Sequence, residues 1–164
     1  PFDAVIIGTG DRNRPSSEST AKNVYVMLRD YNVKPTLFGV DPDASIPAPI
    51  TLDDLYDVTA DPFQDKTDAQ LVDTQKALTS KLGWKFWLNE LGEKTMGAGL
   101  VLDGKLYFTT FLPQAQSFQQ CTIQSIGVMR QYMIDMHYGT SFKYVLDQNG
   151  NKTYYKERFV EVQN

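Results

Sequence analysis

The sequence contains one cysteine and one histidine, and this scarcity excludes several kinds of site. A single cysteine cannot form an internal disulfide framework or a multi-cysteine zinc site. A single histidine makes a helical His-Glu-x-x-His zinc site impossible. No apolar run approaches the roughly 20 residues that a membrane-spanning helix needs. No basic stretch precedes an apolar segment near the first residue, as a secretory signal requires.

The chain also lacks a basic excess. Sixteen Lys and Arg stand against twenty Asp and Glu, so the formal net charge is −4. A protein that neutralises a run of phosphates usually carries more basic than acidic residues, and nucleic acid is therefore not an expected partner. The 164 residues do hold enough apolar material for the core of one ordinary domain, because 41% are hydrophobic and 12% aromatic.

The chain begins with Pro1, and a strand pattern follows almost at once at residues 4–7. A natural chain rarely starts so abruptly inside a regular element. We therefore expect this sequence to be one segment of a longer polypeptide, with any secretion signal outside it.

Strand patterns dominate the sequence. The residues 23–28 alternate in a way that suits a strand covered on both faces. Asp103-Gly104 is the strongest short hairpin signal in the chain. Turn residues separate the other apolar runs, and we predict further strands at 84–88, 98–102, 105–111, 132–136, 141–146, 152–155 and 158–162. The sequence therefore predicts a mainly β fold.

One helical region interrupts the strands, at about 51–82. Thr51 can cap a short turn, and Asp61-Pro62-Phe63-Gln64 has the capping-box pattern of a second helix start. A longer helix is predicted from Asp68, with Gly83 as its C-cap glycine, because four side chains share one face: Leu71, Gln75, Leu78 and Leu82. Before this region, four prolines predict an irregular connector over 32–50, with one short strand at 36–40.

We interpret the glycine-rich turn Gly8-Thr9-Gly10 as structural. It follows an apolar strand, as a dinucleotide-binding loop does, but the third glycine and the following helix are missing. A tight turn between two strands is favoured, and no cofactor-binding residue is predicted.

The candidate for a cation is a turn that holds Asp147, Asn149 and Asn151. These oxygen-bearing side chains alternate like the first half of a calcium loop. Such a loop needs glycine at its sixth position and glutamate at its twelfth, where this sequence has Lys152 and Arg158. A hairpin turn is therefore favoured, and we predict no metal ligand in the segment.

Three other groups of residues have both a chemical and a structural interpretation. Cys121 can be a nucleophile, a small buried hydrophobe, or half of a disulfide whose partner lies elsewhere, and His137 sixteen residues later does not decide between them. Clustered acids suggest either a cation site or helix capping, and capping is favoured for Asp53, Asp54, Asp57 and Asp61. Aromatic residues suggest either a ligand pocket or the core, and the core is favoured for Trp84, Phe86 and Trp87. No catalytic residue is predicted.

Several blocks of sequence match one family in order and spacing. The first reads Val5-Ile6-Ile7-Gly8-Thr9-Gly10-Asp11-Arg12, and further blocks lie at 24–30, 52–59, 81–84, 91–94 and 104–113, ending at Cys121. Together they resemble the C-terminal domain of the PilY1/PilC family, the type IV pilus tip adhesins and assembly factors. The resemblance covers residues 3 to about 121. Beyond it, where the family tends to show a glycine-rich step, this chain reads Ile123-Gln124-Ser125-Ile126-Gly127.

The resemblance implies that residues 1–164 are one segment of a modified β-propeller. This segment would supply several blades' worth of antiparallel strands, with a helical insertion at 51–82 and a Pro-rich connector at 32–50. The implied role is non-enzymatic: pilus assembly, control of retraction, surface attachment and twitching motility. The implied location is the pilus tip, cell surface or outer membrane.

The same resemblance implies the partners and the cofactor. The expected partners are the remainder of the parent propeller, pilus-tip or minor pilin proteins, and a host or abiotic surface. The family's calcium loop is expected upstream of this segment, so calcium is assigned to the parent protein and to no residue here. A propeller segment would also expose sheet edges and apolar faces that neighbouring blades normally cover.

Two alternatives stay open. A propeller enzyme of quinoprotein-like architecture shares the fold, and fold alone does not exclude it, although no converging acids are visible in the sequence. The other alternative is a binding module for a glycan or host protein, with Tyr154 and Tyr155 as exposed anchors.

Overall fold

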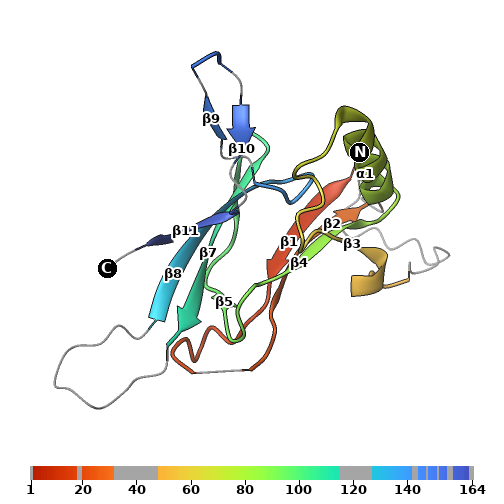
Figure 1. Ribbon diagram of the computed structural model, residues 1–164. Helices are drawn as coiled ribbons and strands as arrows, with labels where there is room; N and C mark the ends of the chain where they lie inside the picture. The colour runs from red at the N-terminus through yellow and green to blue at the C-terminus, as the bar shows by residue number, and fades with distance from the viewer. Residues whose placement is uncertain are drawn as a thin grey trace.

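The computed structural model describes residues 2–17, 20–31, 48–114, 127–141, 144–146, 148–150, 152–154 and 157–162. Within these residues the chain is mainly β, with one α-helix and one short 3-10 helix (Figure 1). The predicted mainly β fold is confirmed. The described strands form open sheets and no closed barrel. The predicted strand at 36–40 and most of the Pro-rich connector lie outside the described residues.

The first sheet has the strand order β1-β2-β4-β3. Its strands are β1 (Asp3–Gly8), β2 (Val24–Asp30), β3 (Tyr56–Asp57) and β4 (Gly83–Trp87). The pairs β1–β2 and β2–β4 are antiparallel, whereas β3 runs parallel to β4. Residues of the predicted helical region 51–82 thus supply an edge strand of this sheet.

The second sheet has the order β11-β8-β7-β5, and β6 also pairs with β7. Its strands are β5 (Lys94–Thr95), β6 (Leu100–Leu102), β7 (Lys105–Pro113), β8 (Gly127–Asp135) and β11 (Phe159–Val162). Asp103 and Gly104 form the predicted hairpin turn, each with positive φ (52° and 70°), as the two-residue turn between twisted strands requires. The strand predicted at 132–136 is longer and begins at Gly127.

A small third sheet projects from this body (Figure 1). It is the antiparallel hairpin of β9 (Tyr144–Leu146) and β10 (Lys152–Tyr154). The strand predicted at 141–146 is therefore only partly correct, because Ser141 makes an isolated bridge to Ile134 instead.

The two larger sheets share one core. Its members are buried side chains of β2, β4, β7, β8, the helix and the residues directly after β3 and β4: Tyr25, Met27, Val58, Leu78, Trp84, Phe86, Leu88, Leu106, Phe108, Tyr132 and Ile134. Alternate residues of β2 face the other way, where Val24 and Val26 pack with Leu55. The prediction that this strand is covered on both faces is confirmed, and Trp84 and Phe86 are core residues as expected.

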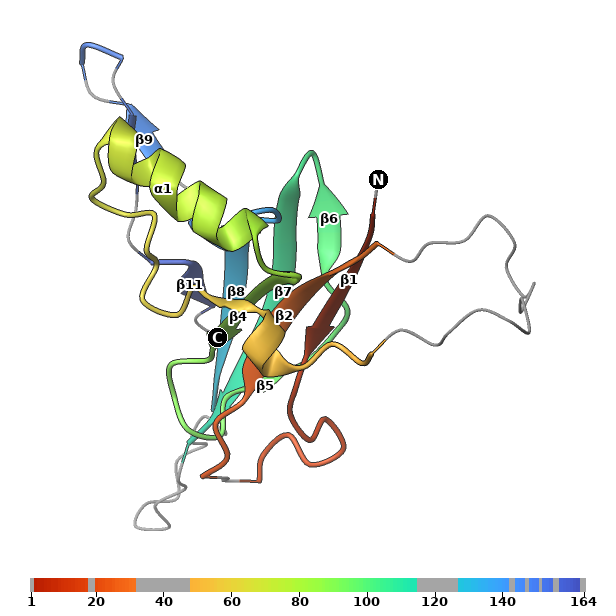
Figure 2. The same ribbon diagram turned by 90° about the vertical axis from the view of Figure 1, so that its right-hand side faces the viewer.

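The helical region is partly as predicted. Thr51 begins the 3-10 helix η1 (Leu52–Asp54) and forms a capping box with Asp54. The helix start predicted at Asp61 is wrong: Asp61 has φ 48° and lies in a turn, while α1 (Asp68–Thr79) begins after Thr67, which pairs with Gln70 in a capping box. Helix α1 lies along one end of the sheets (Figure 2).

The predicted C-cap role of Gly83 is also wrong. Helix α1 ends at Thr79, and Gly83 is instead the first residue of β4. There φ is +146°, and a Cβ atom on Gly83 would lie 1.9 Å from the Met27 carbonyl oxygen. Glycine is required because β2 and β4 approach each other closely at this point.

Candidate functional site

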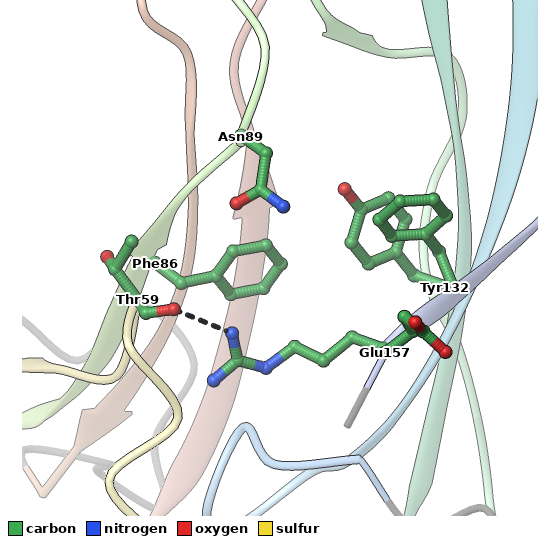
Figure 3. Close-up of a pocket in the computed structure, with 7 residues that line it drawn as sticks. Thr59, Phe86, Asn89, Tyr132 and Glu157 are labelled. Carbon is green, nitrogen blue, oxygen red and sulfur yellow. Dashed lines mark hydrogen bonds between the residues drawn. The ribbon is translucent and has the colours of Figure 1, made fainter. Parts of the chain in front are cut away.

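A pocket opens between the two sheets, with a volume of about 250 Å³ (Figure 3). The first sheet and the loops beside it contribute Thr59, Phe86 and Asn89, and the second sheet and the residues before it contribute Tyr132, Glu157, Arg158 and Phe159. Segments more than 70 residues apart in sequence thus line one hollow. The pocket combines an aromatic floor with polar groups at its rim.

Arg158 spans the gap between the sheets. Its Nε donates to the Gly139 carbonyl at 2.8 Å and its Nη1 to the Thr59 carbonyl at 3.0 Å, the bond drawn in Figure 3. Its Nη2 donates to the Val58 carbonyl. The guanidinium also lies 5.3 Å from the centre of the Phe86 ring. Most of its donors are therefore used by backbone carbonyls, and Arg158 acts as a tie between the sheets more than as an anion receptor.

Asp61 is the carboxylate closest to this arginine, and its contacts are long. Asp61 Oδ2 lies 3.6 Å from Arg158 Nη2 and accepts from the Ser141 N–H at 3.4 Å and from Gln64 Nε2 at 3.4 Å. Asp61 Oδ1 and Ser141 Oγ are buried without a hydrogen-bond partner among the described residues. Burial lowers the pKa of Arg158, and the Asp61 carboxylate offsets this only in part.

A second buried carboxylate, Glu93, has much better partners. It is fully buried, and it accepts from Thr110 Oγ1 at 2.6 Å, Tyr132 OH at 2.9 Å and Arg130 Nη1 at 2.9 Å. Burial acts to lower the pKa of Arg130, but Glu93 and then Glu161 outweigh it and raise that pKa overall. Burial, together with the Glu93 charge, raises the pKa of Tyr132 far above its ordinary value. The Tyr132 hydroxyl is thus a neutral donor and no proton source near neutral pH.

Two side chains at the pocket rim keep their hydrogen-bonding capacity. Asn89 and Glu157 are exposed and have no hydrogen-bond partner among the residues that the structure describes. In contrast, the Thr59 hydroxyl donates to Asp57 at 2.5 Å and accepts from the Trp87 N–H. The pocket therefore offers a carboxylate acceptor and an amide donor and acceptor above an apolar floor, which suits a small polar ligand.

The loop after β1 is tied to the second sheet by two basic residues. Lys94 is almost fully buried and its Nζ donates to the Pro15 and Ser17 carbonyls at 3.0 and 2.6 Å. Arg12 Nε donates to the Thr95 carbonyl at 3.0 Å, and its Nη2 lies 3.4 Å from the Gly8 carbonyl. The predicted turn at Gly8-Thr9-Gly10 thus leads into a loop that is held by lysine and arginine, and the described residues between this turn and β2 contain no helix.

The structure describes only some of the predicted candidate residues. Asn149 is exposed in the β9–β10 turn, whereas Asp147 and Asn151 of the candidate cation turn lie outside the described residues, as do Cys121 and Tyr155. His137 is exposed. The capping interpretation fits Asp53 and Asp54, which lie in the first turn of η1, where Asp54 accepts from Thr51. It does not fit Asp57, which lies in β3 and accepts from Thr59, or Asp61, which is buried beside Arg158.

The described residues form neither a metal-binding group nor a membrane-spanning helix. They contain no group of three or more His, Cys, Asp or Glu side chains placed to hold a metal ion. Among the helices that the structure describes, none has the length and apolar character to cross a membrane.

Among the residues that line the pocket, the sequence points only to Phe86 as a possible pocket residue. It indicates no such role for Glu93, and it places Arg158 only at the start of a strand and in the candidate cation loop. One signal was available: an arginine stands directly before the alternating residues 159–162, next to Phe159. Its partners are 19 to 100 residues away, so the signal did not identify them.

No protein-family model matches the chain, and no curated protein or solved structure matches it.

Proposed function

We propose that this chain is a non-enzymatic structural and adhesive segment of a type IV pilus-associated protein, acting in pilus assembly, control of retraction and surface attachment. Its position within a modified β-propeller at the pilus tip or outer membrane is part of this proposal. The sequence resemblance motivates it. The observation that supports it most is an exposed apolar strip on the outer face of the second sheet.

The strip can be derived from the strand registers. In β7 and β8 the buried Leu106, Phe108, Tyr132 and Ile134 face the core, so the residues between them face outward. Strand β6 places Leu100 opposite Tyr107, and β11 places Val160 opposite Gln131. Four exposed aliphatic side chains on the two flanking strands, which we call the outer apolar strip, therefore share this face: Leu100 and Leu102, each 64% exposed, Val160 at 39% and Val162 at 49%. Between them β7 and β8 place Tyr107 and Met133 together with the polar Lys105, Thr109 and Gln131.

Such a strip suits a segment that packs against another sheet. Stacked sheets bury their facing side chains, and the blades of a propeller are sheets stacked in this way. Exposed apolar patches of this kind mark interaction surfaces in soluble proteins. The occupant that we propose is a neighbouring blade of the parent propeller.

The test uses the parent protein in a piliated strain. Leu102→Lys combined with Val160→Lys should reduce surface pili, attachment and twitching toward the level of a strain that lacks the segment. The matched control is Val72→Lys, because Val72 is 47% exposed on α1, away from the strip. Normal piliation and attachment in the double variant, at normal protein level, would contradict the proposal.

The enzyme alternative has a separate and inexpensive test. A bound quinone absorbs in the near ultraviolet. An absorption spectrum of the purified full-length protein with such a band would favour a quinoprotein-like enzyme, whereas its absence would favour the adhesive role.

A binding module for a glycan is the second candidate, and the pocket is the observation that favours it. Asn89 and Glu157 supply an amide and a carboxylate that can pair with sugar hydroxyls, next to the partly buried Phe159 ring. Binding on an array of immobilised monosaccharides should be lost in Asn89→Ala and kept in Asn149→Ala, which changes an exposed asparagine of the β9–β10 turn. Absence of binding to every sugar would remove this candidate.

A further inference from the structure

The ends of the two sheets differ in how well they are protected against pairing with another strand. Among the described residues, β1 and β3 end the first sheet, and β11, β5 and β6 end the second. An edge strand exposes unpaired backbone N–H and C=O groups, and proteins normally shield such edges by short length, charged side chains or proline. Four of these five strands are shielded in that way.

The shielded strands use two devices. Strands β3, β5 and β6 are only two, two and three residues long. Strand β11 carries Glu161, whose carboxylate pairs with Arg130, and it directly follows Arg158. A partner strand would find few backbone groups or would meet charge at each of these edges.

Strand β1 carries charge only at its two ends. It is six residues long and begins with Asp3, and Arg12 Nη2 lies 3.4 Å from the carbonyl of its last residue, Gly8, but residues 4–8 read Ala-Val-Ile-Ile-Gly, without charge or proline. Val5 and Ile7 are 41% and 47% exposed. In the described part of the chain, β1 has a hydrogen-bonded neighbour on one side only, β2. This is the longest unshielded edge that the structure describes.

The direction of the unpaired groups follows from the ladder with β2. The Thr9 N–H donates to the Val24 carbonyl, which makes this pair a hydrogen-bonded one. Because hydrogen-bonded residues alternate along an antiparallel pair, Val5 and Ile7 direct their backbone groups to β2. The backbone groups of Ala4, Ile6 and Gly8 therefore point to the open edge. The contact of Arg12 with the Gly8 carbonyl fits this direction.

We propose that β1 pairs antiparallel with β1 of a second copy of this chain, joining the two first sheets into one continuous sheet. Charge complementarity selects this arrangement. In the antiparallel pair, Asp3 of each copy lies at the end where the partner has Gly8 and the Arg12 guanidinium beside it. A parallel pair would instead place Asp3 next to Asp3. The antiparallel pair is also two-fold symmetric, as most homodimers are.

The apolar side chains fix the register of the pair. With Ile6 opposite Ile6 of the second copy, Ala4 lies opposite Gly8 and Val5 opposite Ile7. Val5 and Ile7 lie on the same face of the first sheet as Val26 and Leu28, their partners in β2. Each copy thus places its two exposed aliphatic residues against those of the other. Cross-strand pairs of β-branched residues are among those that stabilise a sheet.

Sedimentation equilibrium of the whole 164-residue chain is the first test. We expect a concentration-dependent mass that rises from 18.6 kDa to twice that value. Val5→Lys should weaken the dimer about tenfold or more, because it removes two apolar pairs and places a charge on the open edge. The matched control is Val72→Lys, the same change at a similarly exposed position on α1. A monomer at all concentrations would overturn the proposal.

A cross-linking experiment tests the register without relying on a destabilising change. Val5→Cys and Ile7→Cys chains are prepared separately in a Cys121→Ser background. Under mild oxidation, a mixture of the two should give disulfide-linked dimers, and either chain alone should give few, because Val5 of one copy lies opposite Ile7 of the other and neither residue lies opposite itself. Equal cross-linking of Val5→Cys with itself would overturn this register. A dimer broken by Leu102→Lys and unaffected by Val5→Lys would place the interface on the outer apolar strip instead.

Discussion

The described residues include two buried pairs of arginine and carboxylate, and these pairs are built in opposite ways. In the Arg130–Glu93 pair the ions approach to 2.9 Å, and two hydroxyl groups also donate to the carboxylate. In the Arg158–Asp61 pair the ions are 3.6 Å apart, one carboxylate oxygen has no described partner, and the arginine relies on backbone carbonyls. The pKa of Arg130 is raised, whereas that of Arg158 is lowered.

This difference shows that the role of a buried ion pair depends on the hydrogen bonds that each ion makes outside the pair. Glu93 has enough donors to balance its lost hydration, so its charge is integral to the second sheet. Arg158 has enough acceptors without Asp61, so its role is to join β3 and its following loop to the residues before β11. One pair strengthens a sheet, and the other arginine connects two sheets.

The largest effect is expected at Glu93. Glu93→Gln should lower the free energy of unfolding by about 3–5 kcal/mol, because it leaves the buried Arg130 without its main counter-charge. Urea unfolding measures this. The control is Glu161→Gln, which removes the other, half-exposed carboxylate of the same arginine and should cost at most about 1 kcal/mol. Equal losses in the two variants would contradict the distinction between the pairs.

A smaller effect is expected at Arg158. Arg158→Lys keeps the charge but loses the forked donors, and the buried carbonyls of Val58, Thr59 and Gly139 lose partners, so we expect a loss of about 2–3 kcal/mol. Thermal unfolding of Arg14→Lys, at an exposed arginine, provides the matched control and should show no measurable change. If Arg158→Lys leaves the stability unchanged, the charge of the side chain, and not its hydrogen bonds to carbonyls, joins the sheets.

Asp61 should matter less than either arginine or Glu93. Asp61→Asn keeps the shape of the side chain, and the hydrogen bonds that it weakens are already long. We expect a loss of about 1 kcal/mol or less. If the loss instead reached that of Glu93→Gln, measured in the same urea titration, the Arg158–Asp61 pair would have to be regarded as equivalent to the Arg130–Glu93 pair.

The smallest effect concerns an exposed carboxylate and its pH dependence. Hydrogen bonds from the Thr51 N–H and then from its hydroxyl lower the pKa of Asp54 below 3.8. A carboxylate with a lowered folded pKa stabilises the fold above its unfolded pKa, and this contribution disappears as pH falls through the folded pKa. The stability difference between wild type and Asp54→Asn should therefore shrink on acidification below about pH 4. Thr51→Ala should reduce this dependence, and a pH-independent difference would contradict it.

Local signals in the sequence were sufficient for part of the fold. Asp103-Gly104 needs no distant residue to form its turn, and the alternation at 23–28 predicted the two buried faces of β2 correctly. The capping role of Thr51 was likewise predicted, although its capping box with Asp54, three residues away, was not. These features depend on neighbours in sequence, and the physics of turns and caps is local.

The remaining features depend on partners that are distant in sequence. Asp61 has the pattern of an N-cap, but its carboxylate lies beside Arg158, and the helix begins seven residues later. Gly83 has the pattern of a C-cap, but contact with Met27 across two strands explains it. The pocket joins residue 59 to residue 159, and no periodicity in the sequence links them.

Helix α1 has a consequence for how the protein opens. Of its twelve residues, only Leu78 is fully buried, so little apolar contact holds the helix against β4. A helix of that length is marginal on its own in water. Its amide hydrogens should therefore exchange with solvent deuterium through local opening, well before those of β2 and β4, and limited proteolysis should cut there while both sheets stay folded.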